Sequence, residues 1–134
     1  MNRLQSIPGR IRIVKGAFQE PEQLAIPRSS DLNDRYVQLV EQAIHIGHRV
    51  SIATHDDSII DEVIKRGWIY KSGVEFELLY GVRPDLSNQL KKAGYPVRIY
   101  LTYGHEWYLY LCHRIADYPP NLFQAFLHIR VPKR

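Results

Sequence analysis

The chain has 134 residues, of which 45% are hydrophobic and 24% are charged. This is the size and composition of one globular domain, and it excludes a disordered chain. The formal net charge is +4, but the excess lies mostly near the two ends, so no basic stripe is formed and we expect no nucleic-acid partner.

Cys112 is the single cysteine of the chain, which excludes an intramolecular disulfide and a thiolate metal cluster. No HExxH motif and no paired Cys/His spacing occurs, so we expect no metal site. The sequence also lacks a run of about 18 apolar residues and the apolar core of a signal peptide. We therefore expect no transmembrane helix and a cytoplasmic location.

A β-rich run followed by a helical stretch occurs four times within a single domain, residues 1–134. The predicted strands lie at residues 10–17, 49–55, 74–80 and 97–103. Their spacing leaves room for one helix after each strand. Such alternation predicts βα units and a parallel sheet.

Apolar residues at helical spacing predict the helices between these strands. The three predicted helices lie at residues 31–46, 58–65 and 85–92. Asp31 is the expected N-cap of the first helix, because its carboxylate can accept from the free amides of the first turn. Gly47, Gly67 and Gly94 are expected to end the three helices, since glycine readily adopts the left-handed conformation found there.

Two architectures fit this alternation: half of an eight-stranded barrel, or a small open sheet. The predicted strands contain charged residues, among them Arg10, Arg12, Glu75 and Glu77. In an open sheet covered on both faces these charges would be costly to bury, whereas a barrel lumen can hold them near a ligand. We therefore predict an α/β fold that is half of a TIM-type (βα)8 barrel: four βα units plus a terminal helix at 121–129.

The segment after the fourth predicted strand, residues 103–121, carries a chemically rich helix face. Four residues at helical spacing share that face: Tyr110, His113, Arg114 and Asp117. Most polar helix faces are simply solvated, and that interpretation stays open. The neighbouring aromatic residues favour a second interpretation, a carboxylate clamp, because the planar fork of an arginine matches two carboxylate oxygens.

In both architectures ligands bind at the carboxyl ends of the strands. The residues predicted there combine cations, hydrogen-bonding groups and small side chains: Lys15, Gly16, Ala17, Thr54, His55, Gly81 and Gly104. Each of them alone is equally compatible with a turn or a solvated side chain. Together, at four strand ends, they predict a site for a phosphate-bearing aromatic cofactor.

Five motifs, in this order along residues 10–121, resemble those of the proline dehydrogenase family. They are RIVKGAF (Arg12–Phe18), ATHD (Ala53–Asp56), FELLYGVR (Phe76–Arg83), GYPVRIYLTYG (Gly94–Gly104) and EWYLYLCHRIADYPPN (Glu106–Asn121). Five ordered motifs are far more specific than any one of them. The chain is similar to the C-terminal half of the catalytic barrel of the monofunctional bacterial type.

The resemblance implies FAD-dependent oxidation of L-proline to Δ1-pyrroline-5-carboxylate, with electrons passed on to a membrane quinone, which would make the protein peripheral at the membrane. It implies contact with FAD for these residues: Arg12, Val14, Lys15, Gly16, Ala17, Thr54 and His55. Arg12 would be catalytic, tuning the reactive edge of the flavin. It implies contact with the substrate for these residues: Leu79, Tyr100, Tyr110, His113, Arg114 and Asp117. Arg114 would clamp the proline carboxylate.

The chain departs from the family pattern at several positions of the predicted site. His113 stands where the family has a second arginine, Asp117 where it has Glu, and Glu77 where it has Gln. With the missing N-terminal half of the barrel, these departures leave an alternative open: an inactive half barrel, either a relic or a subunit of a split enzyme. Because a half barrel exposes two sheet edges, we expect an N-terminal half-barrel partner or a homo-oligomer.

Overall fold

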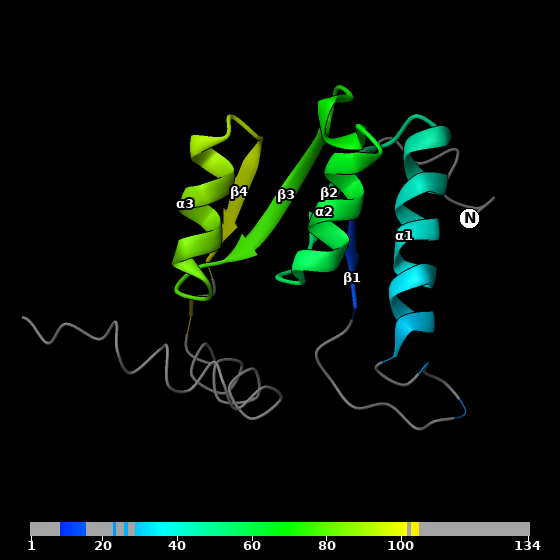
Figure 1. Cartoon of the computed structure of the whole chain (residues 1–134), viewed down its shortest axis with the longest axis horizontal. Coiled ribbons are helices and arrows are strands. Elements are labelled where there is room, and N and C mark those ends of the chain that lie inside the picture. The colour runs from blue at the N-terminus through cyan, green and yellow to red at the C-terminus, as the bar shows by residue number, and fades with distance from the viewer. Residues whose placement is uncertain (1–8, 16–22, 24–25, 27–28, 102, 105–134) are drawn as a thin grey trace, which may run out of the picture.

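The structure is a computed structural model, and it describes residues 9–15, 23, 26, 29–101 and 103–104. Strands and helices alternate along this part of the chain (Figure 1). In order, the elements are β1 (Arg10–Val14), α1 (Ser30–His45), β2 (Arg49–Ala53), α2 (Asp57–Lys65), the short 3₁₀ helix η2 (Trp68–Tyr70), β3 (Val74–Leu79), α3 (Pro84–Lys92) and β4 (Val97–Tyr100).

The four strands form one parallel sheet in the order of the chain, β1-β2-β3-β4. The register aligns Ile13 with Ile52, Ile52 with Phe76, and Phe76 with Val97 across the whole sheet. The helices α1, α2 and α3 lie along one face of this sheet (Figure 1), as right-handed βα crossovers require. Sequential parallel strands with helices on one face are the arrangement found in a TIM-type barrel, and the described residues supply three consecutive βα units followed by a fourth strand.

The core lies between the helices and the sheet. On the two central strands, the residues that point toward the helices are almost fully buried, with Val50, Ile52 and Phe76 all 0% exposed. Helix α1 adds Tyr36, Val40 and Ala43, whose spacing of four and three residues forms one buried stripe. The Tyr36 hydroxyl donates to the Ile13 carbonyl at 2.8 Å, so its one polar atom is satisfied inside the core.

The opposite face of the sheet is polar. Because successive strand residues point to opposite sides, this face is formed by Arg10, Arg12, Val14, Arg49, Ser51, Ala53, Glu75, Glu77, Leu79, Arg98 and Tyr100. We call it the luminal face, since it corresponds to the inside of a barrel. Charged residues in the strands therefore lie where the barrel prediction puts them.

The four predicted strands and the three predicted helices between them are confirmed, with corrections at their ends. Gly47, Gly67 and Gly94 follow α1, α2 and α3 at φ of 92°, 69° and 80°. The prediction that Asp31 is the N-cap of α1 is wrong: the N-cap is Ser29, whose backbone is extended. Asp31 lies in the first turn, where its charge complements the helix dipole.

The strands are shorter than predicted and end at Val14, Ala53, Leu79 and Tyr100. After β2 the reason is visible: the Asp56 amide donates to Thr54 Oγ1, and this turn leads directly into α2. The helix η2 was not predicted. The predicted helices within 103–121 and at 121–129 lie outside the described residues, apart from Tyr103 and Gly104. Within the described part of the chain, no helix is long and apolar enough to cross a membrane.

Replacing Ile52 with Ala tests the core. The side chain is fully buried between β1 and β3, so its truncation should lower the free energy of unfolding by about 2–5 kcal/mol. The matched control is Ile26→Ala, where the side chain is 47% exposed and the expected change is within about 0.5 kcal/mol. Urea unfolding followed by circular dichroism measures both, and equal effects would contradict the assigned core.

Candidate active site

Arg12 crosses the luminal face from one edge of the sheet to the other. Its Nε donates to the Glu77 carboxylate on β3, and it passes over β2, whose luminal side chains Ser51 and Ala53 are small. Its guanidinium carbon also lies 4.9 Å from the centroid of the Tyr100 ring on β4, within cation–π range. The Glu77 side chain is 6% exposed, so its charge depends on this guanidinium as counter-ion. One arginine thus connects β1, β3 and β4.

A second charged row lies below this one, nearer the amino ends of the strands; we call it the lower row, formed by Arg10, Ser51, Glu75 and Arg98. Glu75 accepts from Arg98 Nε at 2.5 Å and from Ser51 Oγ at 2.7 Å, and Arg10 Nη1 is 3.2 Å away. Partial burial alone would raise the pKa of Glu75, but the hydrogen bonds from Arg98 and Ser51 and the charge of Arg10 outweigh it and lower that pKa. Glu75 is therefore firmly ionised.

Asp56 organises the carboxyl end of β2. One of its oxygens accepts from the backbone amide of Ser58 at 3.0 Å and caps α2; the other lies 2.5 Å from Lys15 Nζ, just beyond β1. Asn33 Nδ2 on α1 is 3.5 Å from that second oxygen. Desolvation would raise the pKa of Asp56, but the bonds from Lys15 and Ser58 prevail and lower it to about 2. The carboxylate thus joins β1, α1 and α2 at the edge where ligands bind.

Thr54 and His55 connect backbone groups at the same edge. Thr54 Oγ1 accepts from the amide of Asp56 at 3.1 Å, and His55 Nε2 accepts from the amide of Leu79 at 3.1 Å. Since Nε2 is an acceptor, the neutral imidazole carries its proton on Nδ1. Both side chains therefore stabilise the backbone at the strand ends. They also lie where the sequence predicts a cofactor site.

Large apolar side chains remain exposed near the carboxyl ends of β1, β3 and β4. They are Val14 at 47%, Tyr80 at 69%, Tyr100 at 39%, Leu101 at 57% and Tyr103 at 89% exposure. Exposed apolar groups of this size mark a surface that receives a ligand or another chain segment. Their position beside Arg12 and Lys15 gives this edge both apolar surface and positive charge.

Arg83, in the loop from β3 to α3, has a role that sequence reasoning missed. Its backbone is left-handed at φ 53° and ψ 59°, which is uncommon for a residue with a side chain. Its guanidinium lies 3.1 Å from Asp57 and 3.0 Å from Asp85, in the first turns of α2 and α3. These two ion pairs tie the amino ends of the two helices together and compensate for the backbone strain. The available signal was an arginine placed directly before Pro84 with an acidic residue in each first turn.

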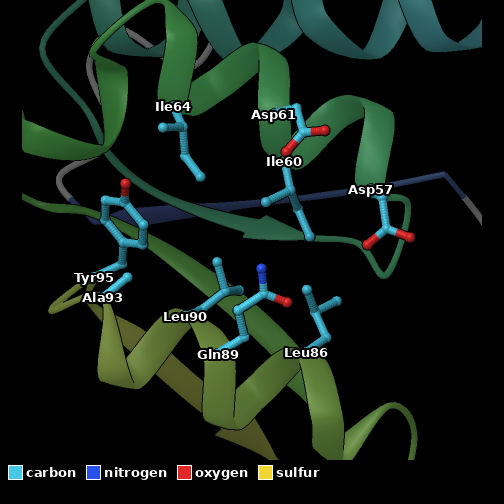
Figure 2. Close-up of a pocket in the computed structure, with 9 residues that line it drawn as sticks. All are labelled: Asp57, Ile60, Asp61, Ile64, Leu86, Gln89, Leu90, Ala93 and Tyr95. Carbon is cyan, nitrogen blue, oxygen red and sulfur yellow. The ribbon is translucent and has the colours of Figure 1, made fainter.

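A groove of about 240 Å³ lies between α2 and α3, away from the luminal face (Figure 2). Figure 2 shows Ile60 and Ile64 of α2 facing Leu86 and Leu90 of α3 across it. Ile60, Leu86 and Leu90 are at most 3% exposed, so the lining is already part of the core. The groove is a space between neighbouring helices and not the ligand site predicted from the strand ends.

The structure brings seven of the predicted site residues to the luminal face or to the carboxyl edge of the sheet: Arg12, Val14, Lys15, Thr54, His55, Leu79 and Tyr100. Their contacts with cofactor and substrate stay predictions. The other six lie outside the described residues: Gly16, Ala17, Tyr110, His113, Arg114 and Asp117. Among the described residues, no group of three or more His, Cys, Asp or Glu side chains is placed to hold a metal ion.

The fold defines part of a TIM-type barrel, a class of protein whose ligand sites lie at the carboxyl ends of the strands. Residues 2–116 match the family model described as proline dehydrogenase. The chain therefore belongs to the proline dehydrogenase family, a family of oxidoreductases, and the resemblance seen in its five motifs is confirmed.

Several curated bacterial proteins are similar to the chain. It is 44% identical over 121 residues to a proline dehydrogenase of Deinococcus radiodurans, covering 88% of this chain and 39% of that protein. It is 40% identical over 126 residues to proline dehydrogenase 2 of Bacillus subtilis (92% and 42% covered) and 33% identical over 124 residues to proline dehydrogenase 1 of that species (90% and 41% covered). The chain thus spans about two fifths of the length of the curated relatives it matches.

Acid unfolding should reveal the Asp56 carboxylate. Its folded pKa of about 2 lies below the value of 3.8 for a free aspartate, so it adds stability above pH 3.8 that is lost as the pH falls toward 2. Asp56→Asn keeps an N-cap acceptor and removes the charge. Because Asp56 is partly solvated, we expect the variant to be less stable than the wild-type chain by about 1 kcal/mol at pH 7. This difference should shrink as the pH falls from 3.8 toward 2, because only the wild-type chain then loses the charge.

Urea unfolding at several pH values between 2 and 7 measures this difference. Asp61→Asn is the matched control, since Asp61 lies on the same helix with an exposed side chain. Parallel stability curves for the wild-type chain and Asp56→Asn would contradict the assigned ion pair.

Proposed function

We propose that this chain forms the part of a proline dehydrogenase that binds FAD and L-proline, and that it acts when the remaining strands complete the barrel. The observation that carries the proposal is the row of Arg12, Glu77 and Tyr100 at the strand ends of a chain that matches the family over residues 2–116. Under this proposal L-proline is oxidised to Δ1-pyrroline-5-carboxylate. The names of the relatives support the substrate; the cofactor and the electron acceptor follow from the family resemblance.

The donor set at the strand ends fits FAD. The ammonium of Lys15 lies at the carboxyl end of β1, where the phosphates of a cofactor bind in such sheets, and Asp56 is its present counter-ion. Val14 and Tyr100 offer half-exposed apolar surface for an aromatic ring system, with the Arg12 guanidinium beside them. Under the proposal Thr54 and His55 contact the same cofactor, and Gly16 and Ala17 let it approach the backbone.

Bound FAD supplies the acceptor for the hydride that leaves the proline ring. The chain itself supplies position and charge. Glu77 holds the Arg12 guanidinium in place, so that its remaining N–H groups can stabilise negative charge that develops on the acceptor. Leu79, Tyr100 and Tyr110 enclose the proline ring, while Arg114 and His113 hold its carboxylate and Asp117 orients Arg114.

The electrons pass to a membrane quinone in this proposal, so the complete enzyme works at the cytoplasmic surface of a membrane. The remaining half of the barrel comes from a partner or from further residues of the same protein. The alternative function, an inactive half barrel, rests on the departures at His113, Asp117 and Glu77. An active reconstituted enzyme would exclude it.

Flavin reduction tests the function directly. The chain is expressed together with the remaining part of the Deinococcus radiodurans relative, loaded with FAD, and mixed with L-proline under anaerobic conditions. We expect the visible flavin absorbance to bleach. Arg12→Gln should slow the bleaching by about 10²-fold, because it removes a charged donor beside the developing negative charge.

Arg35→Gln is the matched control, since Arg35 lies exposed on α1 and hydrogen-bonds to Gln38. It should reduce flavin at the wild-type rate. A reconstituted protein that takes up no FAD, or that keeps its flavin oxidised in the presence of proline, would rule out the enzyme.

The His113 position should make proline binding depend on pH. A histidine carries charge in its protonated form, whereas arginine is always charged. We expect His113→Arg to tighten proline binding in the reconstituted enzyme, most strongly above about pH 7, where the imidazole is neutral. Titration of the flavin spectrum with proline at pH 6 and pH 8 gives the two affinities, and an unchanged affinity at pH 8 would contradict this role.

A further inference from the structure

The luminal face has more positive than negative charge. Among its described residues four arginines, Arg10, Arg12, Arg49 and Arg98, stand against two carboxylates, and Arg49 lies apart from the others at the amino end of β2. Arg12 and Glu77 form one pair, which leaves Glu75 to serve two guanidinium groups. The lower row therefore has one positive charge without a counter-charge of its own.

Arg98 is the member of this row that is open to further contact. Its Nε and Nη2 lie 2.5 Å and 3.2 Å from the two oxygens of Glu75, while its side chain remains 55% exposed. Arg10 is 26% exposed and also donates to the carbonyl of Gly73 at 2.9 Å. The exposed guanidinium of Arg98 is open to solvent, and closure of the lumen would desolvate it, which makes a further counter-charge favourable.

Arg98 also stands beside a free edge of the sheet. In the described part of the chain, β1 and β4 each pair with one neighbour, and Arg98 lies on β4. Parallel sheets occur almost only with both faces covered, and a TIM-type barrel closes with eight strands, which leaves no free edge. The described part of the chain has four of them, and the chain spans 39–42% of the length of these relatives.

We propose that the luminal face and the edges of β1 and β4 dock a different half barrel of four parallel strands, which brings an Asp or Glu carboxylate to Arg98. The occupant is the part of the family's barrel that this chain does not match. A second copy of this chain fits less well, because two equal faces would double the surplus positive charge and add no carboxylate to balance it. The inference rests on the proposed function, because both require a closed barrel. It concerns the charge balance of the lower row and not catalysis.

Binding without cofactor or substrate tests the proposal. The probe is the part of the Deinococcus radiodurans relative outside its matched region, expressed alone and also co-expressed with the 134-residue chain. Light scattering after size exclusion should show a one-to-one complex. Arg98→Glu should weaken its affinity at least tenfold, while Arg98→Lys, which keeps the charge, should stay within about threefold.

Arg35→Glu is the control, because it changes the net charge equally at an exposed position on α1. It should bind the probe like the wild-type chain. If Arg98→Glu does not fold, as judged by circular dichroism, Arg98→Gln takes its place and should weaken binding in the same direction.

Three results would overturn the proposal: a homodimer that does not take up the probe, no soluble complex on co-expression, or a complex whose affinity does not change in Arg98→Glu or Arg98→Gln. Because no FAD or proline is present, a failed complex is distinguishable from a failed catalytic function. A complex that forms with the predicted charge dependence and yet never reduces flavin would support this inference and count against the proposed function.

Discussion

The two-residue alternation of the parallel strands is the constraint on which the rest of the structure depends. It sends Ile52 and Phe76 into the helix-covered core, and it sends their neighbours Ser51 and Glu77 to the luminal face. Because the register is continuous across four strands, a slip of one residue would turn Glu77 into the helix-covered core and Phe76 to the luminal face. Core and charged rows are therefore two results of the same pairing. The size of the β2 side chains adds a second condition, since small residues there leave a path over which an arginine can reach β3.

The strand ends turn this sheet into a site. The Asp56 carboxylate caps α2 and binds Lys15 at once, so the start of a helix and the position of a cation depend on one group. His55 binds the backbone amide of Leu79, which connects the loop after β2 to the last residue of β3. Side chains that the family resemblance assigns to a cofactor thus also support the loops that would surround it. Loss of such a residue would affect both binding and local order.

Sequence patterns predicted the parallel βα alternation because periods of two and of about four residues are local properties. They also placed the charges of β1 and β3 inside a barrel, since such charges cannot be buried in a doubly covered sheet. They did not predict that Arg12 pairs with Glu77 and stacks on Tyr100, because that pair depends on register and on small residues of the strand between. The N-cap was misplaced from Ser29 to Asp31 because a carboxylate suits the cap and the first turn almost equally. Arg83 was missed because left-handed backbone depends on its surroundings, here two aspartates from different helices.

The long connection between β1 and the rest of the sheet has a consequence for how the protein folds. Ser51 and Arg98 reach Glu75 across 24 and 23 positions of the chain, whereas Arg12 reaches Glu77 across 65. Closing a longer loop costs more chain entropy and slows the contact. The β2–β4 region is therefore favoured as the folding nucleus, with β1 docking onto it afterwards. Arg12 and Lys15 belong to that late strand, so the chemistry of this edge is assembled in the last stage of folding.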